Sequence, residues 1–138
     1  MSAEGGPPIV VVAAVIEQSG RFLITRRLAD GHLPGLWEFP GGKCEPGESH
    51  EMCLARELFE ELGVAARVGE EIAVAAHAYP DRTVQLHFRR CEIMGDPQAR
   101  LGQQMQWATR EALAGLEFPA ADRALVSRLV ISSGPRPR

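Results

Sequence analysis

The sequence predicts an α/β fold in a single domain of mixed strands and helices. Residues 9–16 form a continuous apolar run rich in β-branched side chains, which is typical of a buried strand, and a second strand-like segment follows at 21–26. Residues 49–62 have a helical pattern in which Ser49 is a suitable N-cap and Gly63 a suitable stop. A chain of 138 residues that contains both kinds of element fits one α/β domain.

The remaining elements are predicted from turn signals and hydrophobic spacing. Residues 28–47 are rich in glycine and proline, so we expect a structured loop there. Further strands are expected at 67–68, 71–79, 83–94 and 105–108, and a last helix at 120–131. The apolar side of the 49–62 helix is expected to consist of Met52, Ala55, Leu58, Phe59 and Leu62. The domain is expected to span 9–131, with flexible tails at 1–8 and 132–138.

The composition excludes several classes of protein. Hydrophobic residues make up 45% and charged residues 24%, which is ordinary for a folded domain and argues against disorder. The 15 basic and 18 acidic residues give a formal net charge of −3, so stable nucleic-acid binding is not expected. Three cysteines without a CxxC pair argue against a disulfide framework, and no apolar run is long enough to span a bilayer. We therefore expect a cytoplasmic protein with no membrane partner.

Three glutamates cluster on the 49–62 helix. Glu57, Glu60 and Glu61 are spaced i, i+3 and i+4, which places like charges on one face in the second half of the helix, where the helix dipole also disfavours anions. Such a local conflict is expected at functional sites, and several carboxylates are the ligands that Mg²⁺ prefers. The other interpretation is a solvated acidic face paired with Arg56 and surface lysines.

The residues around this helix have a specific spacing. Gly42 is followed after five residues by Glu48, and after seven more by the segment 56–64, which reads RELFEELGV. This pattern resembles the Nudix box, GX5EX7REUXEEXGU with U a bulky aliphatic residue, at every fixed position. The resemblance implies the Nudix fold, an α/β/α sandwich with a mixed β-sheet and a loop-helix-loop box. It also implies hydrolysis of a nucleoside diphosphate linked to another group, with Mg²⁺ as cofactor and Mn²⁺ as the alternative.

The resemblance also implies roles for individual residues. The implied metal ligands are Gly41, through its carbonyl, and Glu57, Glu60 and Glu61. The implied catalytic residues are Glu48, Arg56, Glu57 and Glu60. A bidentate contact from Arg56 to Glu48 or to another box glutamate would orient the carboxylates.

The flanking segments narrow the resemblance to the MutT-type enzymes. Residues 24–27 (ITRR), 37–43 (WEFPGGK) and 79–82 (YPDR) are similar to segments of that group. The implied substrate contacts are Arg27, His32, Glu38, Phe39, Arg82 and Asp122. For Arg27 the alternative is a solubilising strand end, for His32 a loop surface position, and for Phe39 a place in the core.

Two positions depart from the MutT pattern. Leu101 occupies the place of an additional glutamate that serves as metal ligand or general base, so Glu57, Glu60 or Glu38 would have to guide the water. Asp122 replaces the base-reading asparagine. An ionised aspartate only accepts hydrogen bonds, which suits guanine N1–H and N2–H or the cytosine amino group. The alternative for Asp122 is a role in starting the last helix.

The main functional expectation is a Mg²⁺-dependent nucleoside triphosphate pyrophosphohydrolase of the MutT type. It would convert 8-oxo-dGTP or other non-standard (d)NTPs to the NMP and pyrophosphate and so sanitise the nucleotide pool, by attack on either the α or the β phosphorus. The alternative within this chemistry is a CTP, dCTP or 5-modified dCTP pyrophosphohydrolase. A nucleotide-binding sensor with weak catalysis and an RNA-end pyrophosphohydrolase are further alternatives. The partner is expected to be a small-molecule nucleotide, and the protein a monomer, with a dimer as the alternative.

Overall fold

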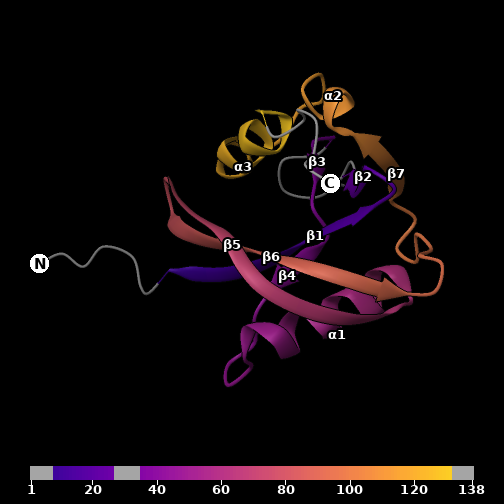
Figure 1. Ribbon diagram of the computed structural model, residues 1–138. Coiled ribbons are helices and arrows are strands. Elements are labelled where there is room, and N and C mark those ends of the chain that lie inside the picture. Colours follow the sequence, from indigo (N-terminus) through magenta and orange to yellow (C-terminus); the bar gives the residue numbers. More distant parts are fainter. Residues whose placement is uncertain (1–7, 27–34, 132–138) are drawn as a thin grey trace, which may run out of the picture.

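The structure is a computed structural model that describes residues 8–26 and 35–131. The predicted tails therefore lie almost entirely outside the described residues. The strands are β1 (Ile9–Gln18), β2 (Arg21–Arg26), β3 (Trp37–Glu38), β4 (Gly41–Lys43), β5 (Ala65–Tyr79), β6 (Arg82–Met94) and β7 (Gln104–Thr109). The helices are α1 (His50–Leu62), α2 (Arg110–Leu113) and α3 (Ala120–Ile131) (Figure 1).

Strand β1 is the centre of a mixed sheet. The strand order is β3-β2-β1-β6-β5, with β4 also paired to β1 and β7 to β2. β1 and β6 run parallel, whereas the other pairs are antiparallel. The predicted apolar run is thus buried between neighbours on both sides, as its continuous hydrophobicity requires.

Helices cover both faces of this sheet, as Figure 1 shows. Val12, Ala14 and Ile16 of β1 pack in one hydrophobic cluster with Leu58 and other side chains of α1. The alternate β1 residues share the opposite cluster with α2 and α3: Ala13, Val15, Leu113, Leu125 and Val126. Since successive side chains of a strand point to opposite faces, β1 connects two cores, and the predicted α/β/α sandwich is confirmed.

The structure differs from the predicted elements at four places. The 28–47 loop contains the short strands β3 and β4 in its described part, and α2 was not predicted. Segments 67–68 and 71–79 belong to one strand, β5, interrupted by a bulge around Glu71. The predicted apolar side of α1 was wrong for Met52 and Phe59, which are 61% and 58% exposed. The buried stripe consists of Cys53, Leu54, Leu58 and Leu62, because the i, i+4 row of leucines is what faces the sheet.

Candidate active site

Helix α1 begins and ends where the sequence predicts. The Ser49 hydroxyl accepts a hydrogen bond from the Met52 amide at 3.1 Å, which caps the first turn. Gly63 adopts a left-handed conformation with φ of 69° and donates its amide to the Phe59 carbonyl at 3.0 Å. With both ends fixed and the leucine stripe buried, the rotation of the helix is set. The orientation of Glu57, Glu60 and Glu61 follows from that rotation.

Two glycines of β4 bring the backbone close to these carboxylates. A Cβ atom at Gly41 would overlap the Val12 carbonyl of the neighbouring strand. A Cβ atom at Gly42 would overlap the carboxyl group of Glu57. Glycine is therefore required at 42 so that the Glu57 carboxylate can lie directly against the strand. The two glycines at the start of the box thus have a steric cause in this chain.

Arg56 forms hydrogen bonds with three glutamates of the box. Its guanidinium binds the Glu48 carboxylate through Nε and Nη2, and its Nη1 donates to Glu57 at 3.1 Å and to Glu60 at 3.3 Å. Nη2 also donates to the Lys43 carbonyl at 3.3 Å. Hydrogen bonding to Arg56 lowers the pKa of Glu48 to about 2, so this carboxylate stays ionised. The predicted bidentate contact between Arg56 and Glu48 is confirmed.

Glu61 is a helix carboxylate whose ionisation is opposed by burial and by its acidic neighbours. Desolvation, a hydrogen bond with Glu57 and the charges of Glu57 and Glu38 raise the pKa of Glu61 to about 9, while a hydrogen bond from the Gly41 amide opposes the shift. Two or three carboxylates that cannot all ionise together are suited to share a divalent cation. The donor set therefore fits Mg²⁺, and the proximity of Glu38 adds a fourth acid to the cluster. The ligand roles of Gly41, Glu57, Glu60 and Glu61 stay predictions.

The loop that carries Leu101 is attached to the end of α1. The Arg100 amide donates to the Glu61 carbonyl at 3.0 Å, and the Gln103 side-chain amide donates to the same carbonyl at 3.2 Å. Gln103 is buried, and its side-chain oxygen accepts from the Leu101 amide at 2.9 Å. Leu101 itself is 55% exposed. The loop is thus attached to the backbone at the end of α1, and Gln103 is a positioning residue for this loop that the sequence did not single out.

Two adjoining pockets lie along β1 and β4, next to the glycines of the box. One, of about 280 Å³, is lined by Glu38, Phe39, Gly41, Gly42 and Lys43 together with Val11, Val12, Ala13, Leu86 and Asp122. The other, of about 330 Å³, is lined by Ile9, Val11, Lys43, Tyr79, Asp81, Arg82, Val84, Leu86, Pro119, Ala121 and Asp122. Lys43 and Asp122 line both pockets, so the two pockets adjoin at these residues and together are called the cleft below. Glu38, Lys43 and the buried Asp122 thus line this cleft, and the Glu57 carboxyl group lies beside it, against Gly42.

The profile of the NUDIX domain matches residues 11–128. The chain belongs to the Nudix family. It is 38% identical over 130 residues to the CTP pyrophosphohydrolase of Escherichia coli (strain K12), covering 94% of this chain and 96% of that protein. It is 33% identical over 121 residues to the 8-oxo-dGTP diphosphatase of the same strain, covering 87% and 94%. The crystal structure of the MutT protein from Methanosarcina mazei Go1 superimposes with a TM-score of 0.83 at 27% identity, covering 97% of this chain and 100% of that chain.

These matches confirm the predicted family and fold, and the chain is a Nudix hydrolase. Of the predicted substrate contacts, Glu38, Phe39, Arg82 and Asp122 line the cleft. Arg27 and His32 lie outside the described residues. Phe39 is buried and stacks on Phe118 with ring centroids 5.6 Å apart, so it is also a core residue. Lys43 was missed as a site residue, although its place directly after the two glycines could have identified it.

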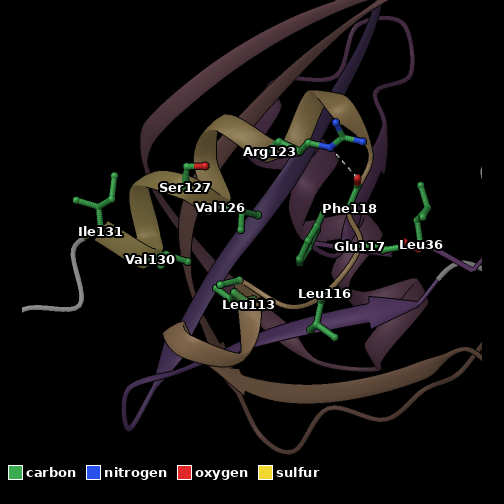
Figure 2. A pocket seen from close by; sticks show the side chains of 11 residues that line it. Leu36, Leu113, Leu116, Glu117, Phe118, Arg123, Val126, Ser127, Val130 and Ile131 are labelled. Atoms are coloured by element: carbon green, nitrogen blue, oxygen red, sulfur yellow. Dashed lines mark hydrogen bonds between the residues drawn. The ribbon is translucent and has the colours of Figure 1, made fainter.

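A cavity larger than either pocket of the cleft lies elsewhere in this Nudix domain. It has a volume of about 690 Å³ and an apolar lining that includes Leu113, Val126 and Val130, between α2 and α3 (Figure 2). Arg123 at its rim donates to the Phe118 carbonyl at 3.4 Å. It shares no lining residue with the two pockets of the cleft, so it is separate from them. Within the described ranges 8–26 and 35–131, no helix is long and apolar enough to cross a membrane.

Proposed function

We propose that this Nudix hydrolase is a Mg²⁺-dependent nucleoside triphosphate pyrophosphohydrolase of the MutT type, which hydrolyses a (d)NTP to the NMP and pyrophosphate. The observation that supports the proposal is the cleft lined by Glu38, Lys43 and the buried Asp122, which also includes Gly42, the glycine that lies against the Glu57 carboxyl group. This arrangement matches a triphosphate beside the Glu57 carboxyl group, held through a divalent cation, and a base next to Asp122. We further propose that the partner is a free nucleotide, that the protein acts as a monomer in the cytoplasm, and that it does not bind nucleic acid stably.

The residues of the chain supply binding and orientation. Mg²⁺ held by Glu57, Glu60, Glu61 and the Gly41 carbonyl would neutralise the polyphosphate and acidify the attacking water. Arg56 fixes the directions of the carboxylates, and Glu48 holds Arg56. Lys43 is placed to contact a phosphate oxygen of the substrate. Because Leu101 offers no carboxylate, we assign the guiding of water to Glu57 or Glu60, with Glu38 nearby.

The candidate substrates differ in their base, and we propose that Asp122 recognises the base. The main candidate is 8-oxo-dGTP or another non-standard (d)NTP. An ionised carboxylate can accept hydrogen bonds from the N1–H and N2–H groups of a guanine base. Asp122 is 5% exposed and lines both pockets, so a base that reaches it is held away from water. We propose that Arg82, which lines one of the pockets, contacts the sugar or the base edge. Hydrolysis of such nucleotides would remove them before their incorporation into DNA.

A second candidate is a cytosine nucleotide: CTP, dCTP or a 5-modified dCTP. The amino group of cytosine is a donor that an aspartate accepts, whereas the asparagine of the MutT pattern presents an amide instead. The 38% identity to a CTP pyrophosphohydrolase supports this candidate. The reaction and the metal site are the same for both candidates, so only the base pocket decides between them.

Pyrophosphate release in Mg²⁺ over 8-oxo-dGTP, dGTP, CTP, dCTP and 5-methyl-dCTP, compared by kcat/KM, tests the proposal. We expect turnover that Glu60→Gln lowers by orders of magnitude, and a ranking of bases that Asp122→Asn changes. Asp96→Asn, at an exposed turn, is the matched control. Binding without pyrophosphate release would overturn the enzymatic proposal in favour of a sensor, and an unchanged ranking in Asp122→Asn would exclude Asp122 as the reader.

A further inference from the structure

A second cluster of metal-ligating side chains lies outside the Nudix box. His50 is the first residue of α1, Glu71 belongs to β5, and His87 belongs to β6. One ligand atom from each of the three lies within 4.8 Å of the others. His87 Nδ1 is 2.7 Å from Glu71 Oε1, and the rings of His50 and His87 have centroids 4.4 Å apart. The two pockets of the active-site cleft are lined by other residues.

The fold brings these three residues together from distant parts of the chain. The Ser49 cap fixes the start of α1 and so places His50 over the sheet. The bulge in β5 changes the register on both sides of Glu71, and bulges commonly redirect a side chain in this way. On β6, His87 shares its face with Arg89, whose Nη2 binds Glu51 of α1 at 3.1 Å. The cluster therefore sits where the first turn of α1 meets β5 and β6.

The hydrogen bonding of His87 suits a metal ligand. Its Nε2 is 3.1 Å from the Gln85 side-chain oxygen, an acceptor, so Nε2 carries a hydrogen when that bond is made. The 2.7 Å contact of Nδ1 with the Glu71 carboxylate has a hydrogen between the two atoms, and a bound cation would take the place of that hydrogen on Nδ1. At protein metal sites, the ring nitrogen of a ligand histidine that does not bind the metal usually donates its hydrogen to an oxygen. Gln85 thus fixes the ring for binding through Nδ1.

The spacing fits a tetrahedral site after small side-chain rotations. Metal bonds of about 2.0–2.2 Å place tetrahedral ligand atoms roughly 3.4 Å apart. The 2.7 Å pair has to open slightly, and the widest pair has to close from at most 4.8 Å. The His87 side chain is 14% exposed and that of Glu71 is 38% exposed. The ligands are thus held by the fold, yet the site is open to solvent for entry of an ion and for a water ligand.

We propose that His50, Glu71 and His87 form a second divalent-metal site, selective for an imidazole-preferring cation such as Zn²⁺ over Mg²⁺. Two imidazoles and one carboxylate suit Zn²⁺ and its neighbours in the transition series, whereas Mg²⁺ prefers oxygen ligands alone. The charge of Arg89 close by is balanced by its ion pair with Glu51. A bound ion would join the first turn of α1 to β5 and β6, so it would stabilise the helix that carries the box glutamates.

Zn²⁺ binding to the full chain tests this site. The protein is stripped of metal with a chelator and dialysed into excess Mg²⁺, which saturates the oxygen-ligand site, and Zn²⁺ is then titrated by calorimetry with thermal melting in parallel. We expect about one Zn²⁺ per chain and a raised Tm. His87→Ala and His50→Gln should each weaken the affinity by about tenfold or more. His77→Ala is the matched control, because His77 lies on β5 and contacts Tyr79 instead of the cluster.

The box must be separated from the cluster in the same experiment. Glu57→Gln should keep the Zn²⁺ site, and circular dichroism shows whether each variant is folded. Zn²⁺ binding that is lost in Glu57→Gln but retained in His50→Gln would place the ion at the box and overturn the proposal. Equal Zn²⁺ affinity in the wild type, His50→Gln and His87→Ala would overturn it as well.

Discussion

Arg56 forms a bidentate ion pair with Glu48, in which Nε donates to Oε2 at 2.6 Å and Nη2 donates to Oε1 at 2.9 Å. The two residues come from different segments, the loop before α1 and the helix itself. The same guanidinium reaches Glu57 and Glu60 through Nη1. One planar group therefore sets the positions of three carboxylates at once.

Arg56→Lys should damage this arrangement although it keeps the charge. A lysine offers one ammonium and cannot reproduce the planar fork, so the carboxylates lose their fixed directions. We expect kcat for pyrophosphate release to fall about 10–100-fold, with a smaller change in KM. Arg67→Lys, in an exposed ion pair with Glu92, should leave kcat unchanged. Wild-type kcat in Arg56→Lys would show that a positive charge alone suffices there.

Gly42→Ala should impair metal binding more than folding. Its methyl group would meet the Glu57 carboxyl, which can move only by leaving its place against β4. We expect a higher Mg²⁺ concentration for half-maximal activity and a lower kcat, both measured by Mg²⁺ titration. Gly115→Ala adds a methyl group in ordinary contact with the Ala112 carbonyl and serves as the control. Equal Mg²⁺ dependence in the two variants would contradict the steric role of Gly42.

Glu61→Gln should make the metal-free protein less sensitive to alkaline pH. The pKa of Glu61 is about 9 in the folded chain and 4.5 in a free side chain, so unfolding releases a proton between these values. Stability due to this group is complete below pH 4.5 and is lost as the pH rises toward 9, by at most about 1.4 kcal/mol per pH unit. Urea unfolding in chelator at pH 5–8 should show a smaller loss in Glu61→Gln than in the wild type. In Glu92→Gln, at an exposed site, the loss should match the wild type.

Leu58→Ala should lower the free energy of unfolding far more than Met52→Ala, although both residues lie on α1. Leu58 is fully buried in the core under the helix, so truncation should cost about 2–5 kcal/mol of unfolding free energy. Met52 is 61% exposed, and its truncation should change that free energy by about 0.5 kcal/mol or less. Denaturant titration of both variants measures the contrast. A comparable loss at Met52 would mean that the helix is rotated relative to the structure described.

Local features of the site could be predicted from the sequence because they depend on neighbours along the chain. The Ser49 cap, the Gly63 stop and the clustering of Glu57 and Glu61 all follow from helical spacing. Short strands such as β3 and β4 were missed because two or three residues carry no periodicity. The apolar side of α1 was partly wrong because hydrophobicity alone does not say which apolar residues face the sheet.

Features that depend on strand register could not be predicted. The meeting of His50, Glu71 and His87 requires the parallel pairing of β1 with β6 and the bulge in β5. A shift of one residue in either pairing would turn a side chain to the other face of the sheet. Lys43 and Asp122 line the same cleft for the same reason, since β4 and the start of α3 come together only through the sheet.

The carboxylates and their supporting glycines come from one stretch of chain, 41–63, whereas the far end of the cleft is built from β1, β6 and the start of α3. Substitutions can therefore change one of these two parts without changing the other. A substitution at Val84 or Ala121 would alter the pocket proposed for the base and would leave the box residues unchanged. Substrate preference in such proteins can therefore change through substitutions in the second part alone, while every intermediate variant keeps the box.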